Sequence, residues 1–170
     1  MTTYIALLRA VNVGGTGKLP MAQLRAMCVE AGFKDVTTYI ASGNVVFSTT
    51  KSAASIKKDL EKRLLEYAGK PVAVMVRTAK EMAAVLDANP FPTEDPKHTY
   101  AIFLDKPPVV EAIEGATGRN DEQLRHGKRE IYVYYPSGMG QSKLKIPAAK
   151  EGTARNMNTL KALIEICNRS

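Results

Sequence analysis

The chain opens with an apolar run that has no polar position on either face, Tyr4-Ile5-Ala6-Leu7-Leu8. A half-exposed strand alternates apolar and polar residues, so this run predicts a strand that is buried on both faces and central in its sheet. After a glycine-rich turn, Pro20 suits the first position of a helix and Gly32 its C-terminal end. Between these two residues the apolar positions recur at helical spacing: Met21, Leu24, Met27, Cys28 and Ala31.

Two short β-prone runs follow, residues 35–40 and 44–48, and the three residues between them predict an antiparallel hairpin. Ser52 then suits the N-cap of a helix whose apolar stripe runs from Ile56 to Ala68. Residues 72–77 are rich in valine and predict another strand. This order, β-α-β-β-α-β, is that of the split βαβ or ferredoxin-like unit, in which two helices cover one face of an antiparallel sheet.

The second half of the chain echoes this order. Thr78 suits the cap of a helix that carries Met82 and Val85 and that ends near Pro90. The later predicted elements are a strand at 98–104, a short helix at 108–115, a hairpin of 122–126 with 130–135, a weak helix at 141–150 and a strong helix at 159–167. We therefore predict an α+β fold of two similar ferredoxin-like subdomains, 1–77 and 78–170, packed around a shared core.

Composition narrows the class of protein. The net charge of +7 favours polyanionic partners such as nucleic acid, and it equally fits a basic surface with no such partner. The two cysteines fall on helical apolar stripes, where each is expected to act as a small buried hydrophobe. No run approaches the roughly 18 apolar residues of a membrane span, and no secretory signal pattern opens the chain. We expect a cytoplasmic protein of bacterial type with no membrane contact.

The turn between the first strand and the first helix contains three glycines, and Arg9, Asn12 and Lys18 lie in or beside it. Gly14 and Gly15 allow the backbone to approach a ligand closely, and the helix after the turn lacks a Ser, Thr, Asp or Asn cap, which leaves its N–H groups open to an anion. The turn is not a P-loop, because Leu19 replaces the Ser or Thr that would hold magnesium. The alternative interpretation is a tight structural turn with a solvated lysine.

Three further polar segments are candidates for the same site. Ser42 and Asn44 lie at the predicted hairpin turn, where Asn is also common for purely conformational reasons. Arg155 and Asn156 precede the last helix, where an Arg beside Asn residues suits phosphate or carboxylate, although Asn156 also suits a helix cap. Lys143 ends a second glycine loop, at 137–143, and is either a ligand group or ordinary surface charge.

Aromatic and catalytic signals are weak. Tyr132, Tyr134 and Tyr135 suggest a stacking surface for bases, but alternating tyrosines on a strand are also typical of packing. The match to an RNA-recognition module is poor, because the first and third strands offer only Tyr4 and Phe47 as aromatic residues. Neither H-E-x-x-H nor G-x-S-x-G occurs, and His98 and His126 are the only histidines. The sequence therefore predicts no metal site and no cofactor, and it identifies no catalytic residue.

Four stretches share a pattern with known proteins: residues 8–15, Lys18 with residues 20–25, residues 38–47 and residues 153–160. Together they resemble a bacterial family of domains of unknown function, the family numbered 1697. The chain departs from the family pattern at Ala41, Ala154 and Met157, where Gln, Thr and Trp are expected. The resemblance implies an α+β fold of two similar halves, and it implies no activity.

Our leading functional hypothesis is a protein that binds an anionic or phosphorylated partner, either a small molecule or nucleic acid, through these glycine-rich basic loops. One alternative is an enzyme that acts on a small phosphorylated substrate. The other is that the loops are purely structural and hold the two subdomains together through hydrogen bonds.

Overall fold

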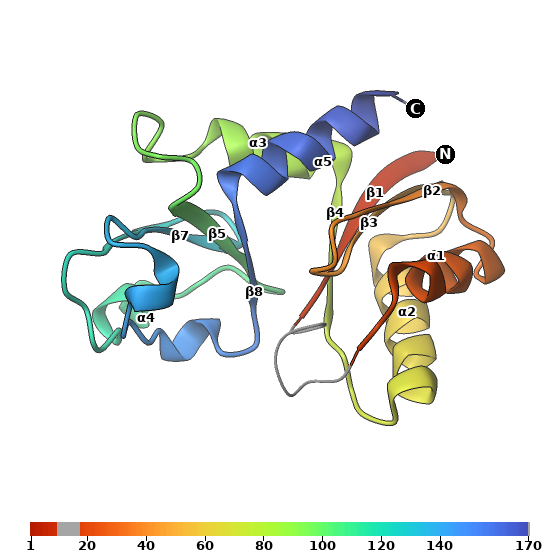
Figure 1. Ribbon diagram of the computed structural model, residues 1–170, viewed down its shortest axis with the longest axis horizontal. Coiled ribbons are helices and arrows are strands. Elements are labelled where there is room, and N and C mark those ends of the chain that lie inside the picture. The colour runs from red at the N-terminus through yellow and green to blue at the C-terminus, as the bar shows by residue number, and fades with distance from the viewer. Residues whose placement is uncertain (10–17, 170) are drawn as a thin grey trace. The chain divides into compact units, whose positions relative to one another are not determined.

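A computed structural model of the chain describes residues 1–9 and 18–169. The chain divides into two compact units (Figure 1). The first comprises Met1–Met82 together with the C-terminal segment that begins at Leu163, and the second comprises Ala83–Ala162. Each unit contains one four-stranded sheet whose paired strands are antiparallel, and each sheet has helices beside it, so the fold is α+β.

The first unit follows the predicted order of strands and helices. Its elements are β1 (Thr2–Leu8), α1 (Met21–Glu30), β2 (Lys34–Tyr39), β3 (Asn44–Thr49), α2 (Ala53–Ala68) and β4 (Val74–Thr78). The strands lie in the order β2-β3-β1-β4, so β1 is a central strand, as its apolar sequence predicted. Helix α3 (Ala79–Asp87) follows β4 directly, and the boundary between the two units falls within it.

Capping residues explain where these helices begin and end. The backbone N–H of Ser55 donates to the Ser52 hydroxyl at 3.2 Å, and Gly69 ends α2 in the left-handed conformation at φ 72°. At the start of α3, the N–H of Glu81 donates to Thr78 Oγ1 at 3.0 Å while the N–H of Thr78 donates to Glu81 Oε1 at 2.9 Å. This reciprocal pair is a capping box, so the predicted cap at Thr78 is confirmed.

Both faces of β1 are buried. Tyr4, Ala6 and Leu8 belong to the core that α1 and α2 cover on one face of the sheet (Figure 1). Ile5 and Leu7 point to the opposite face, because side chains alternate along a strand, and neither is exposed. The prediction of a strand buried on both sides is therefore confirmed.

The second unit repeats the strand order of the first. Its elements are β5 (Thr99–Phe103), α4 (Glu111–Glu114), β6 (Gln123–His126), β7 (Glu130–Tyr134) and β8 (Thr153–Asn156), followed by α5 (Met157–Arg169). The strands lie in the order β6-β7-β5-β8, which corresponds position by position to β2-β3-β1-β4. The predicted hairpin around Gly127 is confirmed, since β6 and β7 pair in antiparallel register.

One prediction for the second half was wrong, and one strand was not predicted. Residues 141–150 do not form a helix, but two short 3-10 turns, Met139–Gln141 and Pro147–Ala149, with an isolated β-bridge from Lys145 to Thr117 between them. Pro147 has no N–H and cannot continue a helical hydrogen-bond ladder, which limits the segment to short turns. Strand β8 was not predicted, because its strand character comes from pairing with β5 rather than from its own composition.

The correspondence between the sheets extends to individual residues. On the central strand of the first sheet, Ile5 is paired with Val46 and Arg77, and in the second sheet Ala101 is paired with Tyr132 and Arg155. Arg77 and Arg155 are both buried, and each directly precedes the residue that caps the following helix. The two halves are thus similar in topology, as predicted. The predicted subdomain boundaries and the shared core stay predictions.

Candidate functional site

The end of β1 and the β2–β3 turn lie side by side. The backbone N–H of Leu8 donates to the carbonyl of Gly43 at 2.8 Å, and Leu7 is paired with Asn44. The next N–H, that of Arg9, donates to the carbonyl of Ala73 at 2.9 Å, directly before β4. The structure therefore brings three predicted site residues, Arg9, Ser42 and Asn44, to one end of the first sheet. We call this region the loop end of the first sheet.

Asn44 holds the turn in shape. Its amide nitrogen donates to the carbonyl of Tyr39 and to the hydroxyl of Ser42, both at 2.9 Å, and the residue is fully buried. The amide thus satisfies a carbonyl of the turn that would otherwise need water or a main-chain partner. At the loop end of the first sheet, Asn44 is accordingly part of the framework that positions Ser42.

The same turn contains a strained residue. Ile40 has a φ of 47°, in the left-handed region, and its side chain is 52% exposed. A β-branched residue rarely adopts this conformation, which typically costs about 1–3 kcal/mol and persists only where the surrounding structure imposes it. The Asn44 amide bonds to the Tyr39 carbonyl, which directly precedes Ile40. Strain of this kind concentrates at functional sites, so the turn is a candidate on that ground as well.

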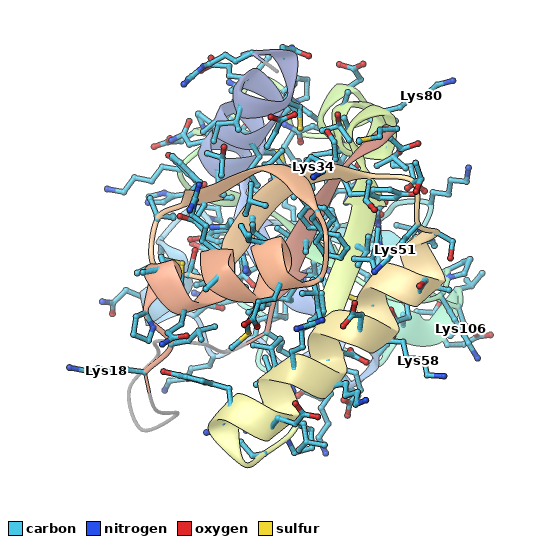
Figure 2. All side chains as sticks on the ribbon, turned by 90° about the vertical axis from the view of Figure 1, so that its right-hand side faces the viewer. Lys18, Lys34, Lys51, Lys58, Lys80 and Lys106 are labelled. Atoms are coloured by element: carbon cyan, nitrogen blue, oxygen red, sulfur yellow. The ribbon has the colours of Figure 1, made fainter. Side chains whose placement is uncertain are left out.

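Helix α1 begins without a side-chain cap. Pro20 occupies the N-cap position and makes no capping hydrogen bond, while Leu19 before it is buried. Lys18 is exposed, and Figure 2 shows its side chain extending away from the ribbon. The start of α1 therefore presents main-chain N–H groups beside a positive charge. The other predicted residues of this turn, Asn12, Gly14 and Gly15, lie outside the described residues.

Arg155 and Asn156 lie in the second unit and bond to protein groups. Arg155 Nη1 donates to Thr153 Oγ1 at 2.8 Å and to the carbonyl of Ala154 at 2.9 Å, and burial lowers the pKa of this guanidinium to about 10. Asn156 Oδ1 accepts from the N–H of Thr159 at 2.9 Å and so caps α5. The capping interpretation of Asn156 is confirmed by this contact.

Lys143 lines a polar cavity of about 310 Å³ in the second unit, together with Asn120, Asp121, Glu122, Ser137 and Gln141 among others. The two carboxylates hold the second glycine loop, because the Ser137 hydroxyl donates to Asp121 at 2.6 Å and the Ser142 hydroxyl donates to Glu122 at 2.5 Å. The Ser142 hydroxyl and the backbone N–H of Asn120 lower the pKa of Glu122. Sequence reasoning missed this arrangement, since no spacing rule connects residues 120–122 with residues 137–142.

Tyr132, Tyr135 and the two cysteines are packing residues. Tyr132 is buried, its hydroxyl donates to the carbonyl of Val85 at 2.6 Å, and burial raises its pKa. Tyr135 makes an edge-to-face contact with Tyr100, and burial raises the pKa of Tyr135 to about 12. Burial likewise raises the pKa of the Cys28 thiol to about 12, which makes it a poor nucleophile. The prediction that both cysteines are buried is confirmed.

Residues 1–132 match a protein family described as "Protein of unknown function (DUF1697)". The chain belongs to the DUF1697 family. The matched region covers the first unit up to Met82 and continues into the second as far as β7. It contains residues 8–15 and residues 38–47, which carry the most specific of the sequence resemblances to DUF1697.

A solved structure supports this arrangement of two units. The chain is similar to a protein described as "The structure of conserved bacterial protein SP0830 from Streptococcus pneumoniae", with 26% sequence identity and a TM-score of 0.79. The similarity covers 97% of this chain and 98% of that one. A search among curated proteins gave no significant match.

Residues 1–9 and 18–169 contain no group of three or more His, Cys, Asp or Glu side chains arranged to hold a metal ion. None of the helices in these residues combines the length and the apolar character needed to cross a bilayer.

Proposed function

We propose that this DUF1697 protein binds an anionic, phosphate-bearing ligand at the loop end of the first sheet. The observation that carries the proposal is the hydrogen bond from Leu8 to Gly43, because it aligns the β1 end, with its basic Arg9, beside the turn that presents Ser42. A cation and a neutral hydroxyl donor at one end of a sheet form a suitable contact set for phosphate oxygens.

The start of α1 adds to this proposal. An uncapped helix N-terminus favours negative charge through its N–H groups and its dipole, and Lys18 adds a full positive charge two residues before the cap position. The net charge of +7 also favours an anionic partner. The proposal uses Arg9, Lys18 and Ser42 as contacts and Asn44 as framework, and it does not depend on Lys143, Arg155 or Asn156 in the second unit.

We also propose that both units are variants of the ferredoxin-like unit and that the protein is cytoplasmic. The element order β1-α1-β2-β3-α2-β4 supports the first statement for the first unit.

A thermal-shift comparison of wild type, Lys18→Ala and Lys58→Ala tests the anion site. Lys58 is an exposed lysine on α2 of the same unit, so its substitution is a matched control for the loss of one positive charge (Figure 2). The panel contains phosphate, sulfate, nucleotides, sugar phosphates and short RNA and DNA. A ligand at one hundred times its Kd stabilises the folded state by about 2.7 kcal/mol, which gives a measurable shift.

We expect one ligand class to stabilise wild type and Lys58→Ala, and to stabilise Lys18→Ala less. Equal shifts in all three proteins, or no shift in wild type, would contradict the proposal. The salt dependence of binding then identifies the partner, since nucleic acid releases several counterions and loses affinity steeply with salt, whereas a small ligand with one phosphate does not.

A further inference from the structure

A second cavity lies entirely within the first unit, beside the start of β2. Its volume is about 710 Å³, within the range of pockets that hold small organic ligands. Helix α1, the start of β2, β3 and the C-terminal part of α5 supply its lining: Arg25, Val29, Phe33, Lys34, Asp35, Val36, Thr37, Val46, Ile166 and Arg169. Arg9, Lys18 and Ser42 are not among these residues, so this cavity is separate from the loop end of the first sheet.

The strand beside the cavity is irregular. Lys34 is paired with Ser48 and Thr37 with Val46, so the register shifts between them and two residues of β2 stand opposite one of β3. Asp35, within this bulge, has a φ of 53°, which is uncommon for a residue other than glycine. Bulges change the direction of side chains and occur frequently beside binding sites. The left-handed Asp35 is a strained position within this bulge, and it lines the cavity.

The lining divides into an apolar part and a basic part. Phe33, Val36 and Val46 are buried, and Val29 extends the apolar surface outward with 51% of its area exposed. Phe33 is held in place, because it stacks on Phe47 with ring centroids 4.3 Å apart and Lys51 Nζ lies 5.5 Å from its ring. Three basic side chains, Arg25, Lys34 and Arg169, accompany a single carboxylate, Asp35, so the charged part of the lining favours a negative ligand.

We propose that this cavity binds a small organic anion with an apolar body and a carboxylate or phosphate head group. The apolar lining would take the body of the ligand, and the three basic side chains would take its head group. A peptide strand added to the edge of β2 is disfavoured, because the bulge and the exposed Lys34 are features that prevent edge-to-edge pairing. The proposal does not rest on the anion site at the loop end of the first sheet.

Isothermal titration calorimetry with the full chain tests this cavity. The probes are decanoate and decyl phosphate, each below its critical micelle concentration, with decanol and inorganic phosphate as probes that have only the apolar body or only the anionic group. The variants are Lys34→Ala and Arg169→Ala, both at exposed positions, with Lys58→Ala as the matched control. Circular dichroism melts check that each variant is folded.

We expect wild type and Lys58→Ala to bind at least one of the two amphiphiles more tightly than decanol or phosphate. Each of the two cavity variants should bind this amphiphile about tenfold more weakly, because each loses one partly exposed, charged hydrogen bond to the head group. The head group that binds more tightly identifies the ligand as a carboxylate or a phosphate ester. In ¹H–¹⁵N spectra, decanoate or decyl phosphate should shift the amide signals of Val29 and Ile166.

Three results would overturn the proposal: no binding of either amphiphile, equal binding of decanol, or the same affinity in the cavity variants as in Lys58→Ala. Lys18→Ala separates the two proposals, because it should leave the binding of decanoate unchanged while it weakens the thermal shift that phosphate-bearing ligands produce at the loop end of the first sheet.

Discussion

The two units use the same strand order but differ in the segment after their third strand. In the first unit, β3 leads into the 16-residue helix α2, whose Ile56, Leu60 and Leu64 are buried in the core. In the second unit, the segment after β7 has only two 3-10 turns, and Leu144, Ile146 and Ala149 pack against the core while only partly buried. The sheet order is therefore preserved although a helix is absent from one copy, which indicates that strand pairing rather than the second helix defines the topology.

The second unit compensates with polar contacts. Glu122 is buried and accepts a hydrogen bond from the Ser142 hydroxyl, which fastens the segment after β7 to the segment before β6, and a second one from the Asn120 N–H within the latter segment. Gly118 reinforces this connection, because a Cβ there would clash with the carbonyl oxygen of Lys143. The segment after the third strand is thus held mainly by apolar burial in the first unit, and mainly by hydrogen bonds and close backbone contact in the second.

The largest expected effect is on apolar burial in the first unit. Leu60→Ala should reduce the free energy of unfolding by about 2–5 kcal/mol, because a fully buried leucine leaves a cavity. The matched change in the second unit, Ile146→Ala, should cost about 1–2 kcal/mol, since Ile146 is only partly buried. Urea denaturation followed by circular dichroism measures both, and hydrogen exchange assigns each loss to one unit. Equal losses of stability in Leu60→Ala and Ile146→Ala would show that apolar burial does not contribute more in the first unit than in the second.

A smaller effect is expected at the β2–β3 turn of the first unit. Asn44→Ala removes two hydrogen bonds and leaves the Tyr39 carbonyl without its amide partner, so stability should fall by about 1–3 kcal/mol. Ser42→Ala removes only one of these contacts and should cost less. Thermal denaturation compares the two variants. If Ser42→Ala is as damaging as Asn44→Ala, the amide is not what shapes this turn.

The smallest effect is a dependence of the second unit on pH. The folded-state pKa of Glu122 is lowered from 4.5, first by the Ser142 hydroxyl and then by the Asn120 N–H. The carboxylate therefore stabilises the fold above pH 4.5, and this contribution is lost as the pH falls through the lower folded-state pKa. Glu122→Gln should be less stable than wild type at pH 7, and the difference in Tm should shrink as the pH falls below 4.5.

Glu114→Gln is the control for this measurement, because Glu114 is exposed on α4 of the same unit. The protection factors of residues 137–145, corrected for the slower intrinsic exchange at low pH, should fall on acidification in wild type more than in Glu122→Gln. A constant Tm difference between wild type and Glu122→Gln from pH 7 to pH 3 would show that Glu122 does not fasten this segment through its charge.

Elements with a strong local pattern were predictable. The apolar β1, the stripe of α2, the caps at Ser52 and Thr78, and the hairpin around Gly127 all depend on residues close together in sequence. Periodicity and capping act over a few residues, so the chain alone determines them. The candidate site was predicted in part by the same means, since Ser42 and Asn44 belong to a local turn and the missing cap of α1 can be read from residues 18–20.

Pairing between distant segments decided the rest. The strand β8 has a polar sequence, and it is a strand because its backbone pairs with β5. Residues 141–150 were predicted as a helix from a weak local preference, which Pro147 and the bridge from Lys145 to Thr117 outweighed. The sequence also could not show which end of β3 lies beside Arg9, because register and direction belong to the pair of strands and not to either strand alone.

The sequence by itself thus determined the α+β class, the β-α-β-β-α-β order of the first unit and the polar residues that are available. Only the tertiary structure decided that Arg9 and Ser42 lie at one sheet end, that Asn44 and Asn156 serve the turn and the α5 cap, and that a bulge beside Asp35 borders a cavity. The physical reason is that propensity and capping are local free energies, whereas pairing register, burial and cavities arise only from contacts between segments that are distant in the chain.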